Sequence, residues 1–155
     1  MTDPRITNVA IDANVLRYNQ TAHDAAVDRL LSLWDGDEVN LFVPHTVLSE
    51  LQHPSTPPLA RRLGETKIFT LPVHLTPPEL KVRQMLRQMM QGNAGQEKHW
   101  ADADHVFDAS KHGSYFITAD ERINGKAKEI AALVTLRVVT LEQFLTIYDC
   151  FAAQD

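Results

Sequence analysis

The stretch VAIDANVLRY, residues 9–18, places an apolar run of strand type directly before a carboxylate. Residues 9–11 have the composition of a strand buried on both faces, because parallel strands covered by helices are continuously apolar. Asp12 follows at once. A second apolar run, YFIT at 115–118, is followed by Asp120 within two residues. We therefore expect two buried strands that each end close to an acid.

Length and composition predict one globular domain. A chain of 155 residues can bury about two-thirds of its unfolded surface, and 44% hydrophobic with 23% charged residues is ordinary for such a domain. We expect a single domain over residues 1–155, without a membrane span or a secretory leader, and hence a cytoplasmic protein. The lone Cys150 cannot form an internal disulfide, and we expect a buried thiol in a reducing compartment.

The net charge of −5 excludes a strongly basic protein that binds nucleic acid without specificity. It does not exclude an enzyme that binds a nucleic acid through a local part of its surface. Acids drawn together to hold divalent cations would also make the total charge negative.

Strand and helix patterns alternate along the chain, which predicts an α/β fold with a central parallel β-sheet flanked by helices. The expected strands cover residues 6–12, 41–43, 114–118 and 135–139. The expected helices cover residues 22–34, 77–91, 96–112, 121–132 and 141–153, with another after Pro44. Gly113 is expected to end the helix before it in a left-handed conformation. The stretch 53–96 is an irregular, proline-rich and helical insertion, with a short extended segment expected at 67–71.

Ligands of open parallel sheets bind beyond the carboxyl ends of the strands, where Asp12 and Asp120 are expected. Each aspartate could instead cap a helix, Asp120 in particular the helix that begins at Glu121. The same placement at two strand ends favours a functional role. Glu50, about two turns into the helix after the second strand, would be a solvated residue if taken alone. Its position at the same edge makes it a candidate.

The segment HWADADHVFDASKHG, residues 99–113, is the richest in ionisable side chains. As a helix it gathers a stripe that should face the core: Trp100, Ala103, Val106, Phe107 and Ser110. Asp102 falls on one flank of the stripe, and Asp104 and Asp108 fall on the other. Periodicity does not decide which flank meets the site.

The histidines of this segment raise the question of zinc. His105 and His112 are expected on the solvent side of the helix, and His99 projects from the opposite quadrant. Neither an HExxH motif nor paired cysteines are present. We therefore do not expect a structural zinc site.

A cluster of carboxylates needs neutralisation, because two unit charges about 4 Å apart repel by roughly 4 kcal/mol at an effective dielectric near 20. Mg²⁺ prefers oxygen ligands and Mn²⁺ suits the same set, so the acids predict one of these ions. Such an ion fits phosphodiester hydrolysis. A GxSxG elbow, a cysteine in a catalytic motif and a Walker glycine loop are all missing from the sequence.

Four fragments in order resemble the PIN domain, a nuclease family whose bacterial members include VapC-type toxins. They are IDANVLRY near the amino end, VPHTVLSEL with Glu50, ADADHVFDASKHGSYFITADERI, and VVTLEQFL near the carboxyl end. The resemblance implies a PIN-like three-layer α/β/α fold and cleavage of single-stranded RNA with Mg²⁺ or Mn²⁺. It also implies a possible toxin of a toxin-antitoxin pair, an antitoxin protein as partner, and a homodimer.

The resemblance implies a catalytic and metal-binding set of Asp12, Glu50, Asp102 and Asp120. An Asp followed by Ala, eleven residues before the helix-ending glycine, selects Asp102, with Asp104 as the fallback. Asn14 and Thr118 match polar positions that support the first and last acids by hydrogen bonding. For Asp104 and Asp108 we favour solvation of the helix. Candidates for phosphate contacts are Arg61, Arg62, Arg83, Arg87 and, foremost, Arg122.

The chain departs from the resemblance at 53–96, which lacks the helix pair expected after Glu50. This difference leaves the substrate, the dimer and the toxin role open. One alternative is a catalytically silent PIN-like module that binds RNA or protein. Another is a phosphatase or phospho-receiver. Those families would require a second acid at the position of Asn14 or a lysine after a late strand, where this chain has residues 118–120.

Overall fold

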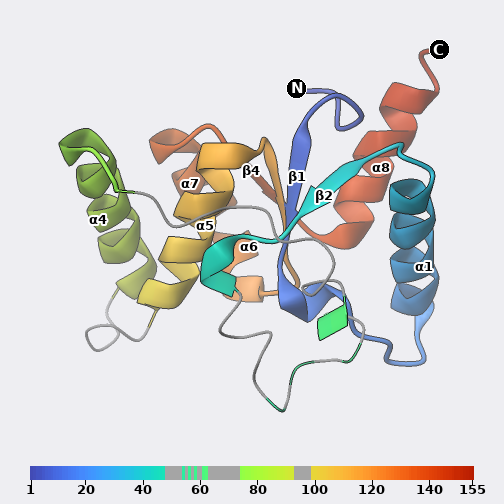
Figure 1. Cartoon of the computed structure of the whole chain (residues 1–155), viewed down its shortest axis with the longest axis horizontal. Helices are drawn as coiled ribbons and strands as arrows, with labels where there is room; N and C mark the ends of the chain where they lie inside the picture. The colour runs from blue at the N-terminus through green and yellow to red at the C-terminus, as the bar shows by residue number, and fades with distance from the viewer. Residues whose placement is uncertain (48–53, 55, 57, 59–60, 63–73, 93–98) are drawn as a thin grey trace.

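The described part of the computed structural model covers residues 1–47, 54, 56, 58, 61–62, 74–92 and 99–155. It contains an all-parallel sheet in the order β2-β1-β3-β4 (Figure 1). The strands are β1 (Asn8–Ile11), β2 (Asn40–Phe42), β3 (Tyr115–Ile117) and β4 (Arg137–Val139). The predicted parallel sheet is confirmed. β1, β3 and β4 are shorter than expected, whereas β2 has the expected length and begins one residue earlier. The extended segment expected at 67–71 lies outside the described residues.

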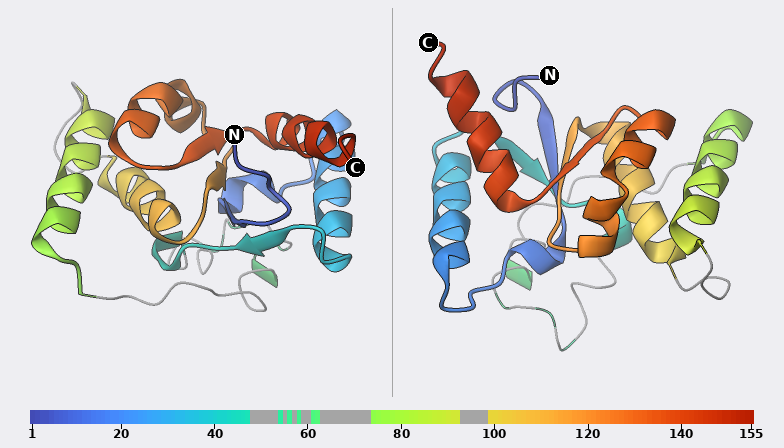
Figure 2. Two further views of the ribbon diagram at one scale, coloured as in Figure 1. Left: turned by 90° about the horizontal axis from the view of Figure 1, so that it is seen from above. Right: turned by 180° about the vertical axis from the view of Figure 1, so that it is seen from behind.

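Helices cover both faces of the sheet, so the predicted three layers are confirmed (Figure 2). One face carries α1 (Ala22–Asp35) and α8 (Leu141–Ala152). The other carries α4 (Pro77–Gln91), α5 (Trp100–His112), α6 (Glu121–Gly125) and α7 (Ala127–Leu133). Two short 3-10 helices, η1 (Ala13–Val15) and η2 (His45–Val47), follow β1 and β2.

Alternation along the strands divides the core in two. In β1, Val9 and Ile11 pack toward α1 and α8, whereas Ala10 packs toward α5 and α4. Phe116 joins Ala10 on that second side. Successive side chains of a strand point to opposite faces, so a continuous apolar run fills both layers.

The helix starts follow the local sequence closely. Thr76 and Glu79 form a capping box at the start of α4, with proline in the first turn, and Thr140 and Gln143 form another at α8. The helix predicted over 121–132 is instead two helices, which meet at Lys126 after Gly125. Glycine disfavours the helix interior, and here the helix breaks beside it.

Gly113 corrects another expectation. Its φ is −145°, so the backbone is extended and not left-handed. A Cβ at this position would lie 2.6 Å from the carbonyl oxygen of Asn8 and 2.8 Å from Cε1 of Phe42. Glycine is required because α5 ends against the start of β1, and not because of its backbone conformation.

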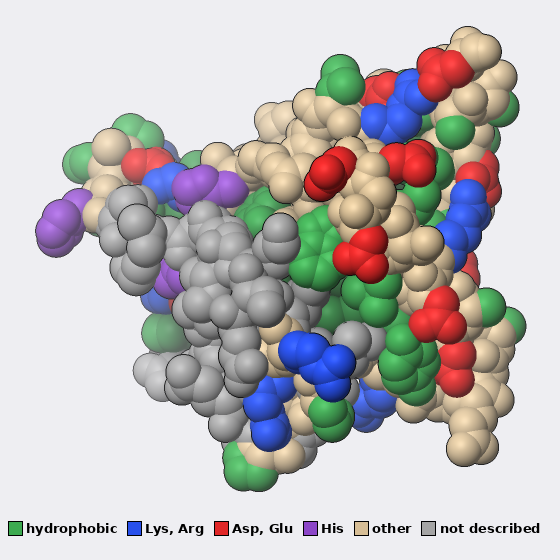
Figure 3. All heavy atoms as spheres, turned by 45° about the vertical axis from the view of Figure 1, so that its right-hand side comes forward, with side chains coloured by type: hydrophobic (Ala, Val, Ile, Leu, Met, Phe, Trp, Pro, Cys, Tyr) green, Lys and Arg blue, Asp and Glu red, His purple; other side chains and the backbone are tan. Residues whose placement is uncertain are grey.

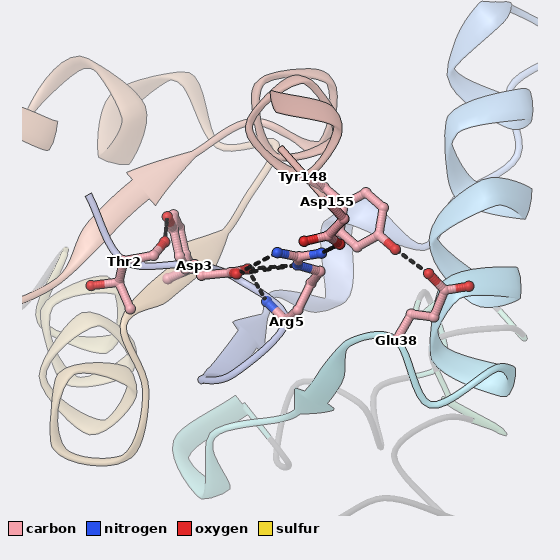
Figure 4. A network of polar contacts seen from close by, with 7 residues as sticks. Thr2, Asp3, Arg5, Glu38, Tyr148 and Asp155 are labelled. Carbon is pink, nitrogen blue, oxygen red and sulfur yellow. Dashed lines mark hydrogen bonds and ion pairs between the residues drawn. The ribbon is translucent and has the colours of Figure 1, made fainter. Parts of the chain in front are cut away.

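Ion pairs link chain segments at the amino edge of the sheet, which is the side where the strands begin (Figure 4). Arg5 lies 2.7 Å from Asp3 (Nη2 to Oδ2) and also contacts Asp155, so it joins the two ends of the described chain. The Arg5 hydrogen bond lowers the pKa of the Asp3 carboxyl. Beside this group, the Tyr148 hydroxyl donates to Glu38. Each of these acids therefore has a donor nearby: Arg5 contacts Asp3 and Asp155, and Tyr148 donates to Glu38.

Two further expectations can be compared with the structure. The thiol of Cys150 is exposed, contrary to the buried thiol expected, because the buried face of α8 is formed by Leu141, Phe144, Leu145 and their neighbours on that side. Within the described ranges, no helix is long and apolar enough to cross a membrane.

Candidate functional site

Asp12 and Asp120 lie at the carboxyl ends of adjacent strands and are joined through Thr118. The β1–β3 ladder continues past Ile11, since the Asp12 amide donates to the carbonyl of Ile117 at 2.9 Å. This register brings Thr118 beside Asp12, and the Thr118 hydroxyl donates to Asp12 Oδ2 at 2.9 Å. The same hydroxyl oxygen accepts from the Asp120 amide at 3.1 Å. Asp12 is 5% exposed and Thr118 is fully buried.

Asn14 closes the connection between the two strand ends. Its Oδ1 accepts from the amide of Ala119 at 3.0 Å, and its Nδ2 lies 3.4 Å from the Thr118 hydroxyl oxygen. A threonine hydroxyl has one hydrogen and two lone pairs, so donation to Asp12 and acceptance from Asp120 and Asn14 are compatible. The structure therefore brings together four of the residues named from the sequence.

The carboxylate of Asp120 caps α6. Capping is the alternative to a functional role that the sequence predicted for this residue. Its Oδ1 accepts from the amides of Arg122 at 2.8 Å and Ile123 at 3.1 Å. Both bonds use one oxygen, and no donor to Oδ2 lies within the described residues. Asn124 donates to the carbonyls of Thr118 and Asp120 and so fixes the turn between β3 and α6. The cap orients the acid and leaves it one oxygen for a ligand.

Asp102 lies in the first turn of α5, 3.6 Å from His99 (Oδ2 to Nδ1). The strands and α5 run in opposite directions, so the start of α5 lies toward the carboxyl edge of the sheet (Figure 1). Among the described residues, however, no group of three or more His, Cys, Asp or Glu side chains could hold a metal ion. Glu50, the remaining predicted acid, lies outside the described residues.

Asp104, the fallback acid, belongs to the contact between α4 and α5. Both of its oxygens accept from Arg87, at 2.8 Å each. This pairing raises the pKa of Arg87, whose guanidinium also lies 4.9 Å over the ring of Trp100. Arg87, a phosphate candidate from the sequence, is thus used to join two helices.

His105 and Asp108 are both buried, which corrects the expectation that they face solvent. Asp108 accepts from the His45 amide at 3.0 Å, and the imidazole Nδ1 of His105 lies 2.9 Å from the hydroxyl of Thr46. The reason is that η2 packs on the flank of α5 that a single helical wheel assigns to water. His112 is exposed, as expected.

Arg122 was the foremost candidate for a phosphate contact, and the structure places it elsewhere. Its Nη2 donates to the carbonyls of Met90 and Gln91, at the last turn of α4. A helix C-terminus carries partial negative charge on its last carbonyls, which a guanidinium satisfies. Arg83 is half-buried, and Arg61 and Arg62 are exposed.

Sequence reasoning missed Asn124 and the pairing of Arg87 with Asp104. Asn124 stands four residues after Asp120, a spacing that places both side chains on one side of a helical turn. That spacing could have indicated Asn124. The Arg87 contact joins residues 17 apart in the chain, and no sequence pattern indicates it.

The face in Figure 3 carries acidic side chains interspersed with basic ones. This distribution agrees with the net charge of −5.

Comparison of the chain with protein-family models, with curated proteins and with solved structures gives no match. The resemblance to the PIN domain family therefore rests on the sequence fragments and stays a prediction.

Proposed function

We propose that this protein is a divalent-metal-dependent endoribonuclease that hydrolyses phosphodiester bonds of single-stranded RNA. The observation that carries the proposal is the connection of Asp12 to Asp120 through Thr118, at the carboxyl ends of adjacent parallel strands. Open parallel sheets bind their ligands at this edge. Burial of Asp12 at 5% exposure supports a specific role, because an ionised carboxylate is costly to bury without compensation.

The donor atoms at this edge suit Mg²⁺ or Mn²⁺. Mg²⁺ is often held by one or two carboxylates, with water and substrate phosphate completing the coordination. Asp12 and Asp120 would supply these carboxylates, Asp102 would approach from the start of α5, and Glu50 is proposed as the fourth acid. The described acids do not form a set of three, so water and phosphate would provide much of the coordination.

The ion would supply an activated water and offset the charge that develops on the phosphate. The residues of the chain would hold the geometry. Thr118 fixes the orientation of Asp12, and the two amides of α6 fix that of Asp120. Arg61 and Arg62 are exposed and are proposed to contact RNA phosphates.

We extend the proposal to the biological setting that the resemblance implies. The protein would act in the cytoplasm as a homodimeric toxin, inhibited by an antitoxin protein. A gene for a small DNA-binding protein directly upstream would support this extension, and an isolated gene would count against it.

The test is cleavage of a mixed panel of single-stranded RNAs with Mn²⁺ or Mg²⁺, with and without EDTA. Asp12→Asn should reduce the cleavage rate at least about 100-fold, equivalent to about 3 kcal/mol of transition-state stabilisation. Asp37→Asn is the matched control, because Asp37 is exposed and its φ of 56° suits asparagine equally. Equal loss in both variants, or cleavage that survives EDTA, would contradict the proposal.

The second candidate is a catalytically silent module that binds RNA or a protein partner. It is favoured by the missing three-acid set among the described residues and by the capping role of Asp120. Calorimetry with Mn²⁺ separates the two candidates. Mn²⁺ binding that Asp12→Asn abolishes supports the nuclease. RNA binding without either cleavage or Mn²⁺ binding supports the silent module.

A further inference from the structure

We propose that the open edge of β4 binds an extended, acidic peptide segment of a partner protein as an added strand. β4 is the last strand in the order β2-β1-β3-β4, and β3 is its neighbour in the sheet. A strand at a sheet edge presents unpaired backbone groups, and peptide addition to such an edge is a recurring mode of recognition. The proposal does not depend on nuclease activity.

The hydrogen-bond pattern shows which backbone groups of β4 face outward. Arg137 donates its amide to the Ser114 carbonyl at 2.9 Å, and Val139 accepts from the Thr118 amide at 3.0 Å. Residues 137 and 139 therefore bond to β3. Alternate residues of a parallel strand bond to opposite sides, so the N–H and C=O of Val138 point away from β3. Within the part of the chain that the structure describes, no other strand pairs with these two groups, so they are available to an added strand.

A groove runs along this edge. It has a volume of about 950 Å³, and every residue from 134 to 140 lines it. Ala131 of α7 and Thr146 of α8 belong to its walls. Seen from behind, β4 runs between α7 and α8 (Figure 2). A groove that follows one strand between two helices has the shape of an extended chain. Apolar residues such as Val134, Val138 and Ile147 in its lining suit small apolar side chains.

The charges of the groove indicate acidic residues in the ligand. Lys128 and Arg137 line the groove, both are exposed, and neither forms an ion pair with a described residue. Glu142, on the α8 side, is already 3.1 Å from Nδ1 of His23. The groove therefore contains two cations without an ion-pair partner among the described residues, although the net charge of the chain is −5. Carboxylates of a bound peptide would complement them.

A second copy of this chain fits the edge less well than a peptide. Val138 is 5% exposed, so the open edge is recessed between its flanking helices. If two copies paired through β4, each would bring its own α7 and α8 against those of the other. A single extended segment reaches the backbone of Val138 without this clash.

The test uses two fluorescent octapeptides that alternate valine with threonine, one with two glutamates and one with two lysines in their place. We expect the acidic peptide to bind the full chain and the basic one to bind at least about tenfold more weakly. Binding should also slow exchange of the Val138 amide hydrogen at least about tenfold, because the added strand covers it.

Two exposed alanines on α7 provide matched variants. Ala131→Tyr fills the groove and should weaken peptide binding at least about tenfold, an effect measurable by fluorescence polarisation. Ala132→Tyr makes the same change at the neighbouring exposed residue, which does not line the groove, and should leave binding unchanged. Lys128→Glu combined with Arg137→Glu should reverse the preference between the two peptides.

Three results would overturn the proposal. One is the lack of binding by the acidic peptide at about 1 mM. Another is binding that Ala131→Tyr and Ala132→Tyr weaken equally. The third is self-association of the chain that Ala131→Tyr abolishes, since a second copy would then be the occupant of the edge.

Discussion

The acidic side chains at the amino edge of the sheet, where the strands begin, have different partners from those at the carboxyl edge, where the strands end. At the amino edge, Asp3 and Asp155 contact Arg5, and Glu79 at the start of α4 lies 2.7 Å from the Lys111 ammonium at the end of α5. At the carboxyl edge, Asp12 accepts from a threonine hydroxyl and Asp120 from backbone amides. An acid paired with a cation is neutralised within the protein. Hydrogen bonds from a hydroxyl or an amide orient an acid without neutralising it, and this orientation is the physical basis of the proposed site.

The largest expected effect tests how closely the amino edge is packed. Gly113→Ala should destabilise the protein by about 2–4 kcal/mol, because its Cβ would lie 2.6 Å from the Asn8 carbonyl oxygen, a backbone atom that cannot simply rotate away. Urea unfolding measures the change. Gly125→Ala is the control, since a Cβ there meets nothing within 4 Å, and it should be neutral or slightly stabilising. Equal stability of the two variants would refute the close contact.

At the carboxyl edge, Thr118→Val should cost about 1–3 kcal/mol. The substitution preserves shape, but it removes the donor to buried Asp12 and the acceptor of the Asp120 amide. Thr118→Ser keeps the hydroxyl and should retain most of the hydrogen bonding. Chemical denaturation of the two variants gives the comparison. If valine were as stable as serine, the bridge between the two acids would contribute nothing.

The contact of Arg122 with the end of α4 should have a smaller effect. Arg122→Met should destabilise the protein by about 1–2 kcal/mol, because the last carbonyls of α4 lose a charged donor. Arg83→Met, on α4 itself, should be nearly neutral, since Arg83 makes no ion pair with a described residue. Thermal unfolding distinguishes the two. A loss of RNA binding with unchanged stability in Arg122→Met would instead restore the phosphate role predicted from the sequence.

The smallest effect concerns the charge pairs of the amino edge and depends on pH. The hydrogen bond from Lys111 holds the pKa of Glu79 at about 2, below its ordinary value of 4.5. The pairing therefore stabilises the protein above about pH 4.5, and this contribution is lost as the pH falls from 4.5 to about 2. Unfolding of wild type and Glu79→Gln should differ slightly at neutral pH and converge in that window. A difference that persists at pH 2 would contradict the pairing.

Local sequence patterns predicted most of the fold. The apolar runs at β1 and β3 and the helical pattern at residues 77–91 act through neighbours in the chain, so their effects can be read from the sequence. The helix break beside Gly125 and the extended backbone of Gly113 were not predicted. Gly113 depends on the approach of Asn8, which is distant in the chain.

For the candidate site, the sequence determined that two strands end close to an acid, since strand ends follow from apolar runs. Capping of α6 by Asp120 was predicted as an alternative, and support of the acids by Asn14 and Thr118 was implied by the resemblance, but the tertiary structure decided the other contacts of the ionisable groups and the geometry of these. It placed Thr118 beside Asp12 through the register of β1 and β3, paired Asp104 with Arg87, and buried Asp108 under η2. A helical wheel represents a single helix surrounded by solvent. The burial and pairing of its side chains depend instead on every element that packs against that helix.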